Sequence, residues 1–260
     1  MITIAVINEK GGVGKTTTAI NLASGLARLD HRVLVLDLDP QSNTTSGFGL
    51  DPAAYRGRAV GDALLIENAD LSPHVVSIEE PLLDIVPATR DLRGIAHQLV
   101  EQGGPIDRLA QALARLTDAY DYAILDLPPT LEIIQENAIQ TADRFIIPIE
   151  LSAFSLDGLT ELIKHLRERK AARPDWAFRI LPSRVEGFNG ATNRATREDL
   201  SPLLSFMLAT TIRFSGKIPL SQREGRDIFA YAPRSRAARD FRALTHEIAT
   251  LWPDQIQQTL

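Results

Sequence analysis

The sequence contains no cysteine among its 260 residues. Disulfides, thiolate zinc sites, iron–sulfur clusters and cysteine nucleophiles are therefore excluded together, and this absence fits a reducing cytosol. No apolar run reaches the roughly 18 residues that a membrane-spanning helix needs. Residues 1–3 lead into an apolar stretch without the basic region or small-residue cleavage site of a signal peptide. We therefore expect a cytoplasmic protein.

Aromatic residues are scarce, at 6%, and the charges are unevenly distributed. Residues 1–163 carry 11 Lys+Arg against 23 Asp+Glu, whereas residues 164–242 carry 17 against 8. The last 18 residues contain no Lys or Arg, and the whole chain has a net charge of −5. A basic segment in an acidic protein indicates a localised anion-binding face, with an ordinary solvated helix surface as the alternative.

Apolar runs rich in Val, Ile and Leu alternate with helical patterns along the chain. We expect strands at residues 2–7, 32–38, 82–86, 122–127, 144–149, 177–181 and 210–214. We expect helices at residues 16–29, 106–116, 156–169 and 237–251, and one more within 191–207. This alternation predicts an α/β fold with a mostly parallel twisted sheet covered by helices on both faces. No linker divides the chain, so a single domain over residues 1–260 is expected.

A glycine-rich segment lies between the first predicted strand and the first predicted helix, where a phosphate-binding loop belongs. The general pattern G-x-x-x-x-G-K-[ST] fails, because Glu9 stands in place of its first glycine. A variant pattern with an additional leading lysine replaces it. Glycines let consecutive backbone N–H groups approach phosphate oxygens without Cβ clashes. The predicted nucleotide-binding residues are Lys10, Gly11, Gly12, Val13, Gly14, Lys15, Thr16 and Thr17.

The polar residues of this loop have distinct expected roles. Lys15 would reach the β- and γ-phosphates, the Thr16 hydroxyl would ligate Mg²⁺, and Thr17 would donate to the α-phosphate. Lys10 cannot easily serve the same phosphates from the same side, because the loop curls round them. We therefore expect Lys10 to meet a nucleotide held by a facing subunit, in a dimer with two nucleotides between its chains.

Aspartates end two of the predicted strands. Asp37 and Asp39 are expected to point to the same side by strand alternation, at the carboxyl edge where parallel sheets bind ligands. Asp39 is expected to orient the attacking water, and Asp126 to hold Mg²⁺ through bound water, as in a Walker B strand. The predicted metal set is Thr16, Asp39 and Asp126. The alternative is that strand-end aspartates only cap the next turn or helix.

Together these motifs resemble the ParA/MinD group of P-loop ATPases. The loop at residues 10–17, LDLDPQ at residues 36–41 and DLPP at residues 126–129 carry this resemblance. NTTSG at residues 43–47 and YAPRSRAA at residues 231–238 look specifically like ParA partition ATPases. In that family Lys10 matches the signature lysine, Lys15 the P-loop lysine, Thr16 the Mg²⁺ ligand and Asp39 the catalytic aspartate.

The resemblance implies ATP and Mg²⁺ as cofactors, slow intrinsic ATP hydrolysis and a homodimer that encloses ATP. It also implies non-specific DNA binding by the ATP form, association with the nucleoid, and a ParB-like partner that stimulates hydrolysis. The chain begins at its first strand, so operator binding through a preceding DNA-binding domain is not expected. Residues 212–215 lack the proline that many members have near the adenine.

Other relatives fit less well. The nitrogenase iron-protein branch needs cysteines, and the superfamily's tyrosine kinases have a C-terminal tyrosine cluster, whereas this chain has no Tyr after Tyr231. MinD-like ATPases end in a basic amphipathic helix, which residues 243–260 cannot form without Lys or Arg, so no membrane partner is expected. Two alternatives stay open: a positioning ATPase for a protein cargo, and a metabolic P-loop enzyme.

The basic segment then predicts a surface for the DNA backbone. Few aromatic residues lie among its arginines, so phosphate contacts rather than base stacking are expected. The contacts favoured within this segment are Arg194, Arg197, Lys217 and Arg223.

Overall fold

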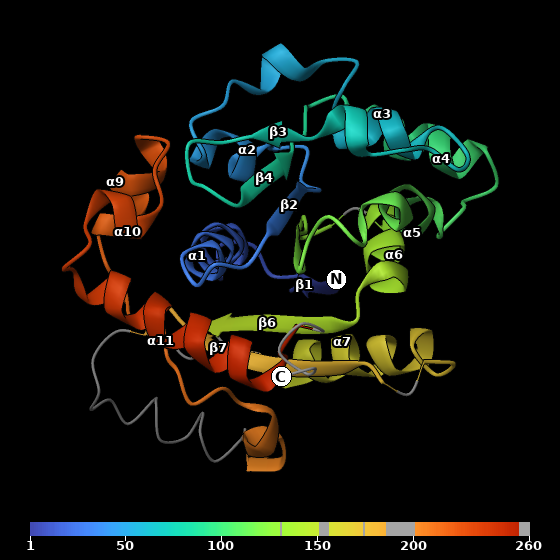
Figure 1. The fold of residues 1–260 in the computed structure, drawn as a ribbon. Helices are drawn as coiled ribbons and strands as arrows, with labels where there is room; N and C mark the ends of the chain where they lie inside the picture. The colour runs from blue at the N-terminus through green and yellow to red at the C-terminus, as the bar shows by residue number, and fades with distance from the viewer. Residues whose placement is uncertain (131, 151–155, 174, 186–200, 255–260) are drawn as a thin grey trace.

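One seven-stranded sheet organises the protein in a computed structural model that describes residues 1–130, 132–150, 156–173, 175–185 and 201–254 (Figure 1). The strand order is β3-β4-β2-β5-β1-β6-β7. The bounds are β1 Ile2–Val6, β2 Val33–Asp37, β3 Val76–Ser77, β4 Leu83–Val86, β5 Tyr122–Asp126, β6 Arg144–Glu150 and β7 Ala177–Ser183. All neighbours pair in parallel except β3, which runs antiparallel to β4. The predicted mostly parallel sheet is confirmed.

Helices cover both faces of the sheet (Figure 1). One face carries α1 (Lys15–Ala27), α10 (Ile228–Tyr231) and α11 (Arg236–Leu251). The other carries α3 (Val60–Leu64), α4 (Leu92–Glu101), α5 (Arg108–Leu113), α6 (Glu132–Thr141) and α7 (Leu156–Arg169). The strands are almost continuously apolar because both of their faces are buried under these helices.

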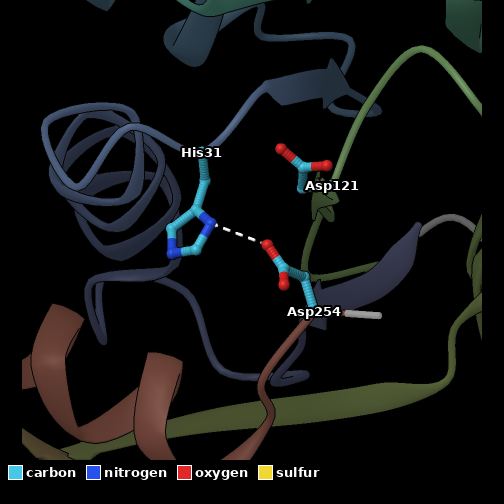
Figure 2. Close-up of side chains that lie close together, drawn as sticks. All are labelled: His31, Asp121 and Asp254. Atoms are coloured by element: carbon cyan, nitrogen blue, oxygen red, sulfur yellow. Dashed lines mark hydrogen bonds and ion pairs between the residues drawn. The ribbon is translucent and has the colours of Figure 1, made fainter. Parts of the chain in front are cut away.

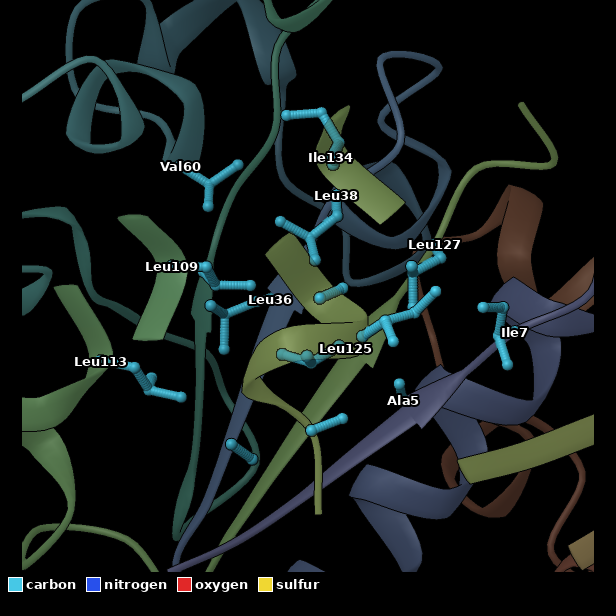
Figure 3. Packing of buried hydrophobic residues seen from close by; sticks show 14 of the residues in the cluster. Ala5, Ile7, Leu36, Leu38, Val60, Leu109, Leu113, Leu125, Leu127 and Ile134 are labelled. Carbon is cyan, nitrogen blue, oxygen red and sulfur yellow. The ribbon is translucent and has the colours of Figure 1, made fainter. Parts of the chain in front are cut away.

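Two apolar cores result, one on each side of the sheet. Figure 3 shows the core under α3–α6, where Leu36 and Leu125 of the sheet face Leu109 and Leu113 of α5. This packing fixes the carboxyl ends of the central strands. In the register of that edge, Asp126 of β5 stands opposite Asp37 of β2 and Val6 of β1. The glycine-rich loop, which follows β1, and the strand-end residues Asp37 and Asp126 therefore lie at the same edge of the sheet.

The predicted strand at residues 210–214 is wrong. These residues make only an isolated bridge between Arg213 and Val185, beside the end of β7. Arg184, directly after β7, has a φ of 53°, which turns the chain out of the extended conformation. The ladder is interrupted there, so residues 210–214 remain irregular. The helix expected within 191–207 falls partly on residues that the structure does not describe, and in the described part Ser201–Phe206 forms a 3₁₀ helix.

The periodicity also missed several elements. It gave no indication of β3, α3, α4 or α6, nor of the short helices α2 (Asn43–Gly47) and α9 (Lys217–Arg223). Both short helices are polar on much of their surface and owe their conformation to neighbours. Short helices are marginal by themselves, so tertiary contacts decide whether they form.

Polar contacts anchor the segment after α11 to the amino-terminal edge of the sheet (Figure 2). His31 Nδ1 lies 2.9 Å from Asp254 Oδ2, and both side chains are buried. The Tyr122 hydroxyl donates to the Trp252 carbonyl oxygen at 2.8 Å. Asp121 accepts hydrogen bonds from Arg32 through both of its oxygens. This polar network is therefore satisfied internally, at the edge opposite to the glycine-rich loop.

Lys170, which follows α7, is a buried lysine. Its Nζ donates to the Gln140 carbonyl oxygen at 2.9 Å and lies over the ring of Phe145. Burial lowers the pKa of Lys170 from 10.5 to about 8. Below this pH the ammonium is charged in the folded and unfolded states alike, and the folded state bears its desolvation cost. Between the two pKa values the unfolded chain binds more protons, so the free energy of unfolding rises with pH.

The substitution Lys170→Met should remove this pH-dependent gain. We expect the free energy of unfolding of the native protein, minus that of the variant, to rise by roughly 3 kcal/mol between about pH 7 and pH 11. Urea denaturation of both proteins across this range measures the difference. A difference that stays constant with pH would contradict the assignment.

Candidate nucleotide site

The loop between β1 and α1 forms an open backbone cradle. Gly14 has a φ of 97°, and a Cβ there would lie 2.9 Å from the Ser183 hydroxyl oxygen, so only glycine fits without movement. A Cβ on Gly11 or Gly12 would meet no heavy atom within 4 Å. The loop therefore has room above it, and its backbone can approach a ligand closely. Val13 is buried beneath it.

Lys15 is the first residue of α1 and is buried. Its Nζ donates to the Lys10 carbonyl oxygen at 3.0 Å, so the ammonium is held against the backbone at the start of the loop. Desolvation lowers the pKa of Lys15, and the nearby carboxylates of Asp126 and Asp39 partly offset this effect. A partly desolvated cation at the beginning of a helix is a strong site for a phosphate group.

Asp126 ends β5 beneath this loop and is fully buried. Its Oδ2 accepts from the Thr16 hydroxyl at 2.8 Å and from the Thr44 hydroxyl at 2.7 Å. Its Oδ1 is buried without a hydrogen-bond partner among the described residues. Burial, with a contribution from the charge of Asp39, raises the pKa of Asp126 to about 6. The unsatisfied oxygen and the Thr16 hydroxyl are hard donors that suit Mg²⁺.

Asp37 and Asp39 differ in what they contact. Asp37 is fully buried and accepts from the backbone N–H and hydroxyl of Thr45 and from the N–H of Asp39. It therefore holds α2 against the end of β2, and burial raises its pKa to about 7. Asp39 lies beyond the last strand residue, so alternation does not govern it. Its side chain accepts from the Gln41 N–H and lines the cavity above the loop.

This cavity has a volume of about 630 Å³. One wall comes from the glycine-rich loop, Asp39 and α2, and the other from the end of β7, residues 212–215 and α9. The volume is within the range of small-molecule sites. A ligand bound here would meet backbone N–H groups, the buried ammonium of Lys15 and the carboxylate of Asp39.

Comparison with known proteins decides the family. Residues 1–175 match the family described as an AAA domain. Over 248 residues the chain is 33% identical to the sporulation initiation inhibitor protein Soj of Bacillus subtilis, covering 95% of this chain and 97% of Soj. The chain belongs to the ParA/Soj family of partition ATPases. It is also 39% identical over 174 residues to the chromosome partitioning protein ParA of Caulobacter vibrioides, covering 66% of this chain and 64% of that one.

The fold agrees with this family. A solved structure of cobyrinic acid a,c-diamide synthase from Mycobacterium smegmatis, with bound ADP and magnesium, superimposes with a TM-score of 0.79 at 26% identity. The alignment covers 96% of each chain. The resemblance to P-loop ATPases inferred from the sequence motifs is thus confirmed. No helix among the described residues is long and apolar enough to cross a membrane.

The leading lysine of this ParA/Soj family member lies at the surface. Lys10 is exposed, and its backbone N–H donates to the Asn8 side chain at 2.9 Å. Its carbonyl oxygen meanwhile accepts from Lys15. The two lysines of the loop therefore lie in different environments, because Lys15 is buried and Lys10 is exposed. That Lys10 reaches a facing subunit stays a prediction.

The residues expected to contact DNA are only partly within the described chain. Lys217 and Arg223 are exposed at the two ends of α9, beside the cavity. Arg194 and Arg197 lie outside the described residues. Arg213, in the same basic segment, is bound by both carboxylate oxygens of Asp240. It therefore serves the packing of α11 rather than an open basic surface.

Sequence reasoning missed three residues that shape the site: Thr44, Ser183 and Gln222. Thr44 binds Asp126, Ser183 packs on the loop, and Gln222 donates to Thr17. The sequence does contain an indication for Thr44, because this residue lies in a polar segment directly after a strand that ends in aspartates. The sequence contains no such indication for Ser183 and Gln222, since both lie far along the chain from the glycine-rich loop.

Ser42 introduces strain between Asp39 and α2. It is a non-glycine residue with a φ of 55°, it is buried, and its hydroxyl has no hydrogen-bond partner among the described residues. Both features are costly. We expect Ser42→Gly to raise the free energy of unfolding by about 1 kcal/mol. Chemical denaturation measures it, with Ser42→Ala as control. Equal stability of the two variants would contradict backbone strain.

Proposed function

We propose that this protein is an ATP-dependent DNA-segregation switch. ATP closes two chains around two nucleotides, the closed dimer binds DNA non-specifically, and hydrolysis releases it. The observation that carries the proposal is the pairing of a buried Lys15 with an exposed Lys10 on one phosphate loop. A phosphate site within one chain needs only Lys15, and the proposal gives Lys10 its role at the nucleotide of the facing chain.

The proposal assigns a role to each residue of the site. The loop residues 10–17 hold the phosphates, with Lys15 reaching the β- and γ-groups and the Thr17 hydroxyl reaching the α-group. Thr16, with Asp39 and Asp126 through bound water, would hold Mg²⁺, which would neutralise phosphate charge when bound. Asp39 orients the attacking water. The buried Asp37 maintains the position of α2 and takes no part in chemistry.

DNA binding in the proposal depends on the basic segment. Lys217 and Arg223 project from α9, which is also a wall of the nucleotide cavity. Two such helices in a dimer present twice the number of cations, so DNA favours the closed form by linkage. A ParB-like partner would accelerate hydrolysis, and the protein would be located on the nucleoid in the cytoplasm.

One experiment tests the switch. DNA affinity is measured with a non-hydrolysable ATP analogue, with ADP and without nucleotide, at several salt concentrations. We expect tight binding only with the analogue, with log K falling against log salt by about 0.9 for each phosphate contacted. Lys217→Ala removes one such contact from each chain and should therefore lower this slope by about 2 in the dimer. DNA binding that is equal in all three states would exclude the switch and favour a metabolic P-loop enzyme.

A further inference from the structure

Helix α9 is joined to the nucleotide site through one side chain. Gln222 Nε2 donates to the Thr17 hydroxyl oxygen at 3.2 Å, and both residues line the cavity. The two residues are 205 positions apart in the sequence. Thr17 is on the first turn of α1, directly after the loop residues that hold phosphate. The contact therefore connects the phosphate cradle with the helix that carries Lys217 and Arg223.

A hydroxyl can accept one hydrogen bond and donate another at the same time. The Thr17 oxygen accepts from Gln222, so its proton remains available to an acceptor in the cavity. A phosphate oxygen is such an acceptor. When a nucleotide binds, the chain Gln222 N–H to Thr17 O–H to phosphate becomes continuous, and each bond polarises the next. The Gln222 contact is thus stronger with nucleotide than without.

Two further contacts hold the segment that follows α9, one to α1 and one to the segment after α2. Ile228, at the start of α10, donates its N–H to Asn21 Oδ1 of α1 at 2.8 Å. Neither residue of this bond lines the cavity. Gly225, after α9, has a φ of 64°, and a Cβ there would lie 2.4 Å from the Gly49 Cα. The turn after α9 thus packs backbone to backbone on the segment that follows α2 (Figure 1).

This packing links α9 to the acidic side of the site as well. α2 is tied to Asp37 through Thr45 and to Asp126 through Thr44. The helix therefore touches both walls that surround the phosphates, while its basic ends remain exposed to solvent. Of its contacts described above, the one from Gln222 to Thr17 joins two residues that line the cavity.

We propose that Gln222 is a positioning residue that couples nucleotide occupancy, through the Thr17 hydroxyl, to the order and orientation of the basic helix α9. Where it concerns DNA, this inference rests on the proposed function. Gln222 does not contribute to the chemical step. Through this hydrogen bond, a bound phosphate chain orders α9 and so fixes the positions of Lys217 and Arg223 at its two ends.

Amide hydrogen exchange of residues 217–226 tests the coupling without DNA and without turnover. In the native protein, Mg²⁺ with a non-hydrolysable ATP analogue should slow exchange in this segment about fivefold or more relative to the nucleotide-free protein. Gln222→Met keeps the length of the side chain but removes the donor, and should abolish this slowing. Leu220→Met, at an exposed position of the same helix, is the matched control and should behave as the native protein.

The Thr17 hydroxyl is tested in the same way. Thr17→Val should abolish the slowing at saturating nucleotide, Thr17→Ser should retain it, and adding Gln222→Met to Thr17→Val should cause no further loss. Equal slowing in the native protein and Gln222→Met, or no slowing in the native protein, would overturn the inference. The proposed function fails separately, if the native protein shows this slowing but binds DNA equally with the analogue and with ADP.

Discussion

Replacing Lys10 with alanine should abolish ATP-dependent dimerisation and lower ATP turnover by about a thousandfold, while ADP affinity stays nearly unchanged. Lys10 is exposed, and its replacement leaves the glycines of the cradle and the buried Lys15 unchanged. A cation supplied across an interface to a transferring phosphate typically contributes about this much to the rate. Sedimentation with the ATP analogue, turnover, and fluorescent ADP titration measure the three effects.

Lys15→Ala is the matched comparison for this experiment. It removes the buried ammonium, whose pKa is lowered by desolvation and which faces the cavity beside Asp126 and Asp39. We expect nucleotide affinity itself to fall by at least about tenfold to a hundredfold, because a charge-assisted contact to phosphate is lost. Dimerisation and turnover are lost as a consequence. If Lys10→Ala still dimerises and hydrolyses ATP as the native protein does, the two-lysine arrangement has no function across an interface.

Asp39→Ala should separate hydrolysis from binding. We expect turnover to fall by roughly a hundredfold to ten-thousandfold, the usual contribution of a group that orients and deprotonates an attacking water. Nucleotide binding should persist, because Asp39 is not part of the backbone cradle, and the dimer should therefore accumulate. Single-turnover phosphate release together with sedimentation measures both effects.

Asp37→Asn is the control for Asp39, two residues away. Each oxygen of Asp37 accepts from a donor, so an amide nitrogen in its place would oppose an N–H or hydroxyl group. The expected cost is about 1–3 kcal/mol in the free energy of unfolding, with turnover of the folded protein retained. Should Asp37→Asn abolish hydrolysis while Asp39→Ala does not, the assigned roles are reversed.

Much of the fold could be predicted from periodicity. The strands β1, β2, β5 and β6 are continuous apolar runs because helices bury both of their faces, and α7 and α11 have clear amphipathic patterns. The strand expected at residues 210–214 failed because the left-handed backbone at Arg184, directly after β7, ends the extended partner that it would pair with. The apolar pattern within 210–214 carries no information about the backbone at Arg184, which lies 26 to 30 positions earlier.

The sequence by itself determined the phosphate loop, because a strand, glycines, two lysines and a helix follow one another within a few residues and interact locally. It also determined which acids end the central strands. Only the tertiary structure decided that Asp37 holds α2 whereas Asp39 lines the cavity, that Thr44 binds Asp126, and that Gln222 meets Thr17. The Thr44–Asp126 and Gln222–Thr17 contacts join residues that are 82 and 205 positions apart, at the carboxyl edge of the sheet. Strand order and side-chain packing, rather than any local pattern, bring them together.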